Sequence, residues 1–133
     1  MAGNTIQPVK TANAAPPGGH YAQAVRYKDT LYISGQLPVC ADGSHSANET
    51  FDTQALIALN NLLAILREAG GDITDLVKVT VYIVGAKHWP CFNTVYAKRL
   101  GSHRPARAVV PVPELHHGYL IEIEATARLH RSA

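Results

Sequence analysis

The 133-residue sequence has few cysteines and none of the glycine-rich signatures of nucleotide-binding proteins. Its two cysteines, Cys40 and Cys91, lack CxxC spacing and are too few for a disulfide framework, so we expect two free thiols. Neither GxxxxGK[ST] nor GxGxxG occurs in the chain, which excludes the usual phosphate-binding loops. Any catalytic or binding site must therefore be built from side chains outside these motifs.

Long apolar segments and strong charge are also missing. No apolar run approaches the ~20 residues that span a bilayer, and the N-terminal residues lack the apolar core of a secretory signal. The net charge is only +2, and the basic residues are scattered rather than clustered on one face. We therefore expect a cytoplasmic protein with no membrane or nucleic-acid partner.

The seven histidines do not form a recognisable metal-binding pattern. HExxH and H-x-H spacings are absent. His116 and His117 are adjacent, so on an extended chain their side chains point apart. We expect no metal site and no cofactor.

The length of the chain and its turn signals predict one domain over residues 1–133. Prolines and glycines crowd residues 1–20, which we expect to form an irregular arm. Residues 21–36 then predict a β-hairpin, with its tight turn at Lys28 and Asp29.

Two amphipathic helices follow. Ser46 and Glu49 fit a capping box ahead of a helix that Gly70 ends. Its apolar face carries Phe51, Ala55, Leu59, Leu62, Leu63 and Leu66, and Gln54 falls on the polar face. The second helix covers residues 88–100, with Trp89, Phe92, Val95, Tyr96 and Leu100 on the side we expect to be buried.

Three more strands complete a ββαβαββ order. They cover residues 75–84, 104–112 and 121–129, and in the first we expect Val77 to share one face with Val79, Val81 and Ile83. This order predicts an α+β fold, a mixed sheet with both helices on one face. The other face is semi-polar, which suits either solvent or self-association in a closed oligomer.

Two charged positions on the last two strands are candidates for a site. Arg107 could bind a carboxylate through two parallel hydrogen bonds, and Glu122 could hold or activate a water. Each has a plain alternative: Arg107 as an exposed strand-end residue, and Glu122 as part of a solvated edge. The pattern alone does not decide between these readings.

The ordered fragments "APPGGHYAQAV", "LYISGQLPV", "QALIALNNLLAILREAGG", "LVKVTVYIV", "FNTVYAKRL", "RPARAVV" and "IEIEATA" resemble the YjgF/RidA family over about residues 14–129. The resemblance implies a chorismate-mutase-like fold that forms a homotrimer around a central barrel, with ligand sites between subunits. It also implies a metal-independent deaminase that needs no cofactor. Such an enzyme hydrolyses reactive enamines and imines, such as 2-aminoacrylate, to 2-keto acids and ammonia.

The same resemblance implies site residues. Arg107 of "PAR" would bind the substrate carboxylate, and Glu122 of "EIEA" would orient the attacking water. Substrate-binding positions are Tyr21, Ser34, Asn93, Arg107 and Val109. Val109 occupies a position that is often cysteine in the family, and "LHHGY" replaces the usual "LP" of the following loop.

Two alternatives to a deaminase follow from the family resemblance, and the sequence supports them unequally. A non-catalytic trimer could use the same cleft to bind or sense a small carboxylate, because a fold and a pocket do not fix an activity. RNA cleavage or inhibition of translation has also been attached to the family. We expect neither of these RNA-related roles, because the chain has no basic stripe with stacking aromatics.

Overall fold

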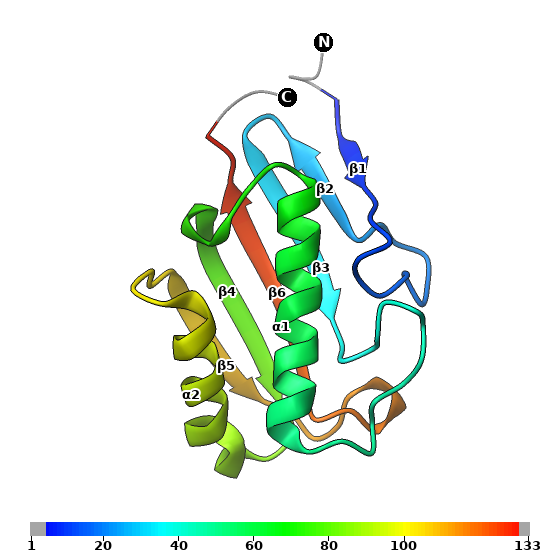
Figure 1. Ribbon diagram of the computed structural model, residues 1–133, viewed down its shortest axis with the longest axis vertical. Helices are drawn as coiled ribbons and strands as arrows, with labels where there is room; N and C mark the ends of the chain where they lie inside the picture. The colour runs from blue at the N-terminus through cyan, green and yellow to red at the C-terminus, as the bar shows by residue number, and fades with distance from the viewer. Residues whose placement is uncertain (1–4, 131–133) are drawn as a thin grey trace.

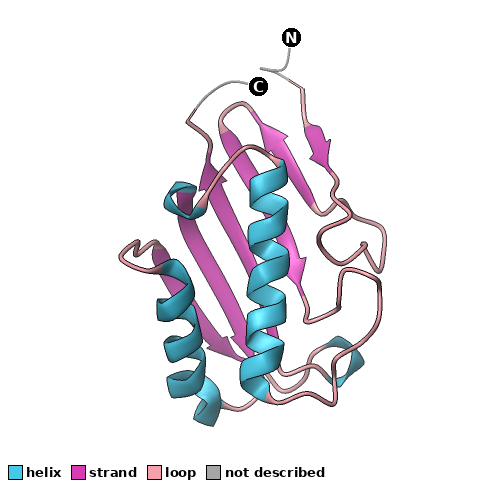
Figure 2. Cartoon of the chain, viewed as in Figure 1, coloured by secondary structure: helices cyan, strands magenta, loops and turns pink. Residues whose placement is uncertain are grey.

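The computed structural model describes residues 5–130, which form one mixed β-sheet with two long helices on one face (Figures 1 and 2). The strands are β1 (Gln7–Val9), β2 (Ala24–Tyr27), β3 (Thr30–Gln36), β4 (Leu76–Ile83), β5 (Ala106–Pro111) and β6 (Ile121–Arg128). Their spatial order is β1-β2-β3-β6-β4-β5, and only β4 and β5 run parallel. The predicted α+β class is confirmed.

The helices are α1 (Phe51–Glu68) and α2 (Trp89–Leu100), and three short 3-10 turns, η1 (Ile73–Asp75), η2 (Ala86–His88) and η3 (His116–Gly118), lie in the connections. In the described part of the chain, no helix combines the length and the apolar character of a membrane span. Figure 1 shows α1 crossing the middle of the sheet and α2 lying beside it over β5.

The N-terminal arm is partly a strand, which corrects the prediction of an irregular segment. β1 pairs antiparallel with β2, with Gln7 opposite Arg26 and Val9 opposite Ala24. The pairing satisfies backbone groups at an edge that would otherwise stay open. Residues 1–4 of the predicted arm lie outside the described residues.

The predicted hairpin is confirmed. Tyr27 pairs with Thr30, so the connection between β2 and β3 consists of Lys28 and Asp29. Lys28 adopts a positive φ of 54°, as tight hairpin turns require.

Helix α1 forms the centre of the core with its predicted apolar face, every member of which is buried. The predicted capping box is wrong, because the helix begins at Phe51 and the hydroxyl of Ser46 donates to the Pro38 carbonyl instead. Gln54 was also misplaced: it is fully buried rather than on the polar face. A polar residue can occupy the core when its hydrogen bonds are made inside the protein.

Strand β4 differs from its prediction at one end. The pairing of β4 with β6 shifts register between Leu76 and Lys78, which leaves Val77 half exposed while Leu76 is buried. The alternation then resumes, and Val79, Val81 and Ile83 are buried as predicted. A bulge changes which residues face the core, and periodicity cannot detect it.

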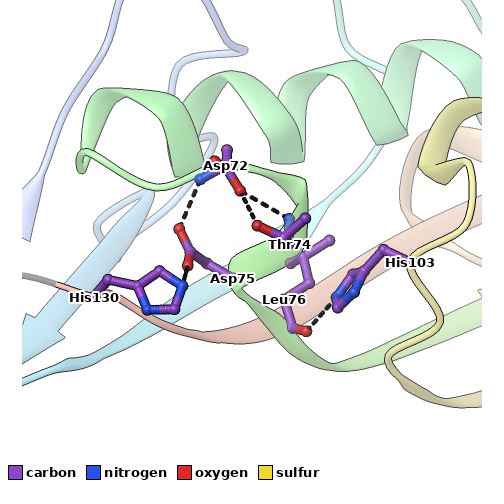
Figure 3. A network of polar contacts seen from close by, with 6 residues as sticks. All are labelled: Asp72, Thr74, Asp75, Leu76, His103 and His130. Carbon is purple, nitrogen blue, oxygen red and sulfur yellow. Dashed lines mark hydrogen bonds and ion pairs between the residues drawn. The ribbon is translucent and has the colours of Figure 1, made fainter.

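Polar contacts fix the end of the sheet where β4 begins (Figure 3). Asp72 and Asp75 form a capping box around η1, and His130 Nε2 lies 2.6 Å from the buried carboxylate of Asp75. His103 Nε2 donates to the Leu76 carbonyl at 2.8 Å, which ties the segment before β5 to the start of β4. This contact helps to fix the entry of the chain into β5, where Arg107 lies.

Candidate functional site

Glu122 lines a pocket of about 460 Å³ beside the end of β3. Most of the wall comes from the loop before β2, the end of β3, the loop that follows it and η3. Its polar and aromatic lining includes Tyr21, Gln23, Ser34, Gln36, His45, His116, His117 and Glu122. The predicted site residues Tyr21, Ser34 and Glu122 therefore share one cavity.

The carboxyl group of Glu122 lies directly over Gly35. A β-carbon at position 35 would be only 2.7 Å from Glu122 Oε2, so the close approach depends on glycine. Burial raises the pKa of Glu122, the nearby carboxylate of Glu124 raises it further, and His116 acts in the opposite direction. A carboxyl group with a raised pKa beside a cavity is suited to accept a proton from water.

Short hydrogen bonds hold the neighbouring wall in place. The Ser34 hydroxyl donates to the Ala22 carbonyl at 2.7 Å, and the Tyr21 hydroxyl accepts from the Gly18 N–H at 3.1 Å. Tyr21 remains 49% exposed, so its ring is available to a ligand or to another chain. These contacts orient the pocket wall around Glu122.

Buried amides anchor the loops of this pocket, and sequence patterns gave no sign of that role. Asn61 accepts from the Ala15 N–H and donates to the Leu37 and Val39 carbonyls. Gln23 and Gln54 make comparable bonds to backbone groups of Thr11, Ala15, Ala47, Glu49 and Leu120. From the sequence alone, an asparagine or glutamine side chain is expected on the surface, because the backbone groups that it bonds in distant loops are not known.

Arg107 lies in a different pocket, of about 500 Å³, between α2 and the start of β5. Its Nη1 donates to Asn93 Oδ1 at 3.0 Å, so these two predicted site residues are neighbours. The guanidinium carbon lies 4.9 Å from the ring centre of Tyr96, 5.6 Å from Phe92 and 5.7 Å from Trp89. Cation–π contacts of this kind restrict where the guanidinium can point.

Trp89 corrects another prediction. Its side chain is 44% exposed rather than buried, because it lies at the start of α2 beside Arg107. The Tyr96 hydroxyl is buried in the same region and has no hydrogen-bond partner. The helical pattern assigned both residues to the core, which is confirmed for Tyr96 and wrong for Trp89. Spacing alone cannot separate an aromatic core residue from an exposed one that lies beside a charge.

Val109 lies two residues after Arg107 on the same face of β5. It pairs with Val81 and is partly buried against the core cluster. Both it and Arg107 therefore face the helical layer, whereas Glu122 alternates with the buried Ile121 and Ile123 and faces the opposite side of the sheet.

The predicted partners Arg107 and Glu122 do not meet within one chain. Their strands are not neighbours, because β4 lies between β5 and β6. Arg107 is level with Val79 while Glu122 is level with Tyr82, so the two backbones differ by three residues along the strand and by two strand spacings. Strand geometry puts them about 14 Å apart, with side chains on opposite faces.

The loop between β5 and β6 also differs from its prediction. His116 and His117 do not point apart: η3 brings their ring centres to 4.0 Å, and the ring of His45 is 4.6 Å from that of His117. His117 has a left-handed φ of 61°, which turns the chain sharply. Within residues 5–130, no group of three or more histidine, cysteine or acidic residues is arranged to hold a metal ion.

Residues 11–129 match a family model described as endoribonuclease L-PSP. A RutC family protein of Pyrococcus horikoshii is 38% identical over 88% of this chain and 93% of the relative. Human 2-iminobutanoate/2-iminopropanoate deaminase is 37% identical over 90% of this chain and 87% of the human protein. A yeast relative that is named as mitochondrial, Mmf1, is 33% identical over 92% of this chain and 84% of its own.

Solved structures share the fold. RidA from a Psychrobacter species superposes with a TM-score of 0.89 at 35% identity, covering 92% of this chain and 99% of that protein. Escherichia coli TdcF with bound serine superposes with a TM-score of 0.87 at 32% identity, covering 95% of this chain and 99% of TdcF.

Proposed function

Because the chain belongs to the YjgF/RidA family, which the matching model describes as endoribonuclease L-PSP, we propose that it hydrolyses reactive enamines and imines to 2-keto acids and ammonia. The observation that carries the proposal is Glu122, a half-buried carboxyl group with a raised pKa in a pocket shared with Ser34 and Tyr21. The human and goat relatives named as 2-iminobutanoate/2-iminopropanoate deaminases support the same chemistry.

Two copies of the chain complete the site in this proposal. A substrate held by Arg107 and attacked by a water at Glu122 must touch both side chains, which one chain keeps on opposite faces of its sheet. The semi-polar sheet face carries Tyr32 at 50% exposure and Val110 at 37%, apolar surface that a partner subunit would cover. We therefore propose a homotrimer in which Arg107 of one copy faces the Glu122 pocket of the next.

The reaction balances with water alone. Arg107 holds the substrate carboxylate and so fixes the position of the reactive carbon. An enamine first moves a proton to its terminal carbon and becomes the imine. Glu122 accepts a proton from water as the oxygen bonds to the imine carbon, and that proton then passes to the nitrogen, which gives a tetrahedral adduct with one hydroxyl and one amino group. Glu122 then accepts the hydroxyl proton and passes it to the amino group as the carbonyl forms. The carbon–nitrogen bond breaks, which releases ammonia and leaves the 2-keto acid.

The wild-type protein should accelerate the decay of 2-iminopropanoate that an amino-acid oxidase or dehydratase generates. The rate should fall as pH drops through the raised pKa of Glu122, because the protonated carboxyl group cannot accept a proton from water. Imine decay and ammonia release with and without the protein, over a pH series, measure this. Unchanged decay together with binding of pyruvate would favour the small-carboxylate-binding function instead.

Gly35→Ala should lower kcat by about 10²-fold while the protein stays folded, because small displacements of a catalytic group have effects of that order. The new β-carbon would displace the flexible end of Glu122, which can swing aside without disturbing the backbone. Gly18→Ala is the matched control, since Gly18 lines the same pocket and a β-carbon there meets nothing within 4 Å. Equal activity of the two variants would show that the position of Glu122 is not critical.

A further inference from the structure

Three imidazoles stand beside Glu122 in a pocket whose other lining residues carry no charge. His45, His116 and His117 come from two loops far apart in the sequence, and all three line the pocket. Glu122 is the only acidic residue among the described residues that line it. The three imidazoles lie together, with the ring centre of His117 4.6 Å from that of His45 and 4.0 Å from that of His116, and each can donate a hydrogen bond or accept a proton.

The position of His117 is fixed by the fold. Its backbone adopts a left-handed φ of 61°, a conformation that is uncommon outside glycine. Tyr119, fully buried two residues later, anchors the loop, and its ring lies edge-on to that of His117 at 6.2 Å. Backbone strain that the surrounding structure maintains often marks a functional position.

Hydrogen bonding determines the tautomer of His45. The buried hydroxyl of Tyr119 accepts from the Ser46 N–H at 3.2 Å and lies 2.6 Å from His45 Nδ1. Because the phenolic proton needs an acceptor in this buried place, Nδ1 accepts it and the neutral ring carries its own proton on Nε2. His45 is thereby a fixed N–H donor at the pocket wall.

The free pocket disfavours positive charge on His117. Loss of solvent lowers the pKa of His117, and the neighbouring rings of His116 and His45 lower it further. An anion placed among these rings would reverse that effect, since an opposite charge stabilises the protonated imidazole. An entering negatively charged group would therefore favour the protonated form of His117 and accept hydrogen bonds from the cluster.

We propose that His45, His116 and His117 form a second carboxylate subsite, so that the preferred substrates are imino acids with an additional carboxylate on the side chain. The inference rests on the proposed function, in which Arg107 of a neighbouring copy takes the first carboxylate. The second carboxylate lies at the imidazole end of the Glu122 pocket. Monocarboxylic imines occupy the same pocket and leave this end to water.

Steady-state assays should compare the imines derived from glutamate and from alanine. For the wild-type protein, kcat/KM should be higher for the dicarboxylic imine. His117→Ala should lower that value about tenfold, the loss of one charge-assisted hydrogen bond, and change the value for the alanine-derived imine less than about twofold. His130→Gln removes an imidazole at the opposite end of β6 and should change neither value.

Binding of the stable products separates the subsite from the chemistry. The affinity for 2-oxoglutarate should exceed that for pyruvate in calorimetric titrations, and His117→Ala should remove the difference. Equal affinities, or equal losses for both ligands, would overturn the subsite even if imine turnover persists. Selective binding of 2-oxoglutarate without turnover of any imine would overturn the proposed deaminase and support the subsite.

Discussion

Replacement of Arg107 with alanine should lower kcat/KM for imine hydrolysis by about 10²- to 10³-fold. Truncation of a group that binds a carboxylate through charge-assisted hydrogen bonds usually costs a few kcal/mol, and each 1.4 kcal/mol is a factor of ten. The effect should be near the upper end, because Asn93 and three aromatic rings already hold the guanidinium in one direction. Little reorganisation is then needed on binding.

Arg107→Lys should restore only a small part of the activity. Lysine keeps the charge but not the planar fork that matches a carboxylate. Arg104→Ala is the matched control, because Arg104 lines the same pocket and is exposed. Size-exclusion chromatography with light scattering should show the same oligomer for all variants. Near wild-type turnover by a folded Arg107→Ala protein would refute the role of Arg107 as the carboxylate anchor.

Two inactive variants should regain activity when their subunits are mixed. Arg107→Ala keeps an intact Glu122, and Glu122→Gln keeps an intact Arg107. If each site takes these residues from different copies, a mixed trimer contains one complete cleft among its three. Such trimers should show about one third of the wild-type activity, because every mixed composition of a cyclic trimer has one complete cleft.

The measurement requires co-expression of the two variants with different affinity tags and purification on both tags in succession. Trimers of each single variant, purified in the same way, provide the background rate. No activity above that background in purified mixed trimers would place the complete site within one chain. That result would contradict the opposite orientations of Arg107 and Glu122 about the sheet.

Local patterns in the sequence were enough to predict both long helices and the strands β2 to β6. The last strand alternates with period two, and its apolar residues Ile121, Ile123, Ala125, Ala127 and Leu129 are all buried. The helical period of α1 did the same for its apolar face, and Lys28 and Asp29 marked the hairpin turn. Burial of apolar surface and turn geometry depend on neighbouring residues, so these features can be inferred without a structure.

Several errors came from contacts between distant segments. Gln54 is buried because its amide bonds the backbone of two loops, including the N–H of Leu120. Trp89 is exposed beside Arg107, and Val77 is turned outward by a bulge against β6. In each case a partner far along the chain changes the environment, and the local pattern does not contain that partner.

The candidate site, too, was predicted only in part from the sequence. Resemblance to a family drew attention to Arg107, Glu122, Tyr21, Ser34 and Asn93, and residue types alone suggested a carboxylate ligand and a water base. Only the tertiary structure shows that β4 separates β5 from β6, so that Arg107 and Glu122 face opposite sides. Strand order depends on long-range pairing, which periodicity leaves undetermined.

The sequence by itself determined the kind of protein: an α+β domain whose alternating and helical patterns define its core and whose polar residues are suited to a small carboxylate. The tertiary structure decided where the chemistry can occur. It placed Gly35 under Glu122, surrounded Arg107 with aromatic rings and gathered His45, His116 and His117 at one end of the pocket. These arrangements join residues from separate loops and strands, and only the folded chain brings such residues together.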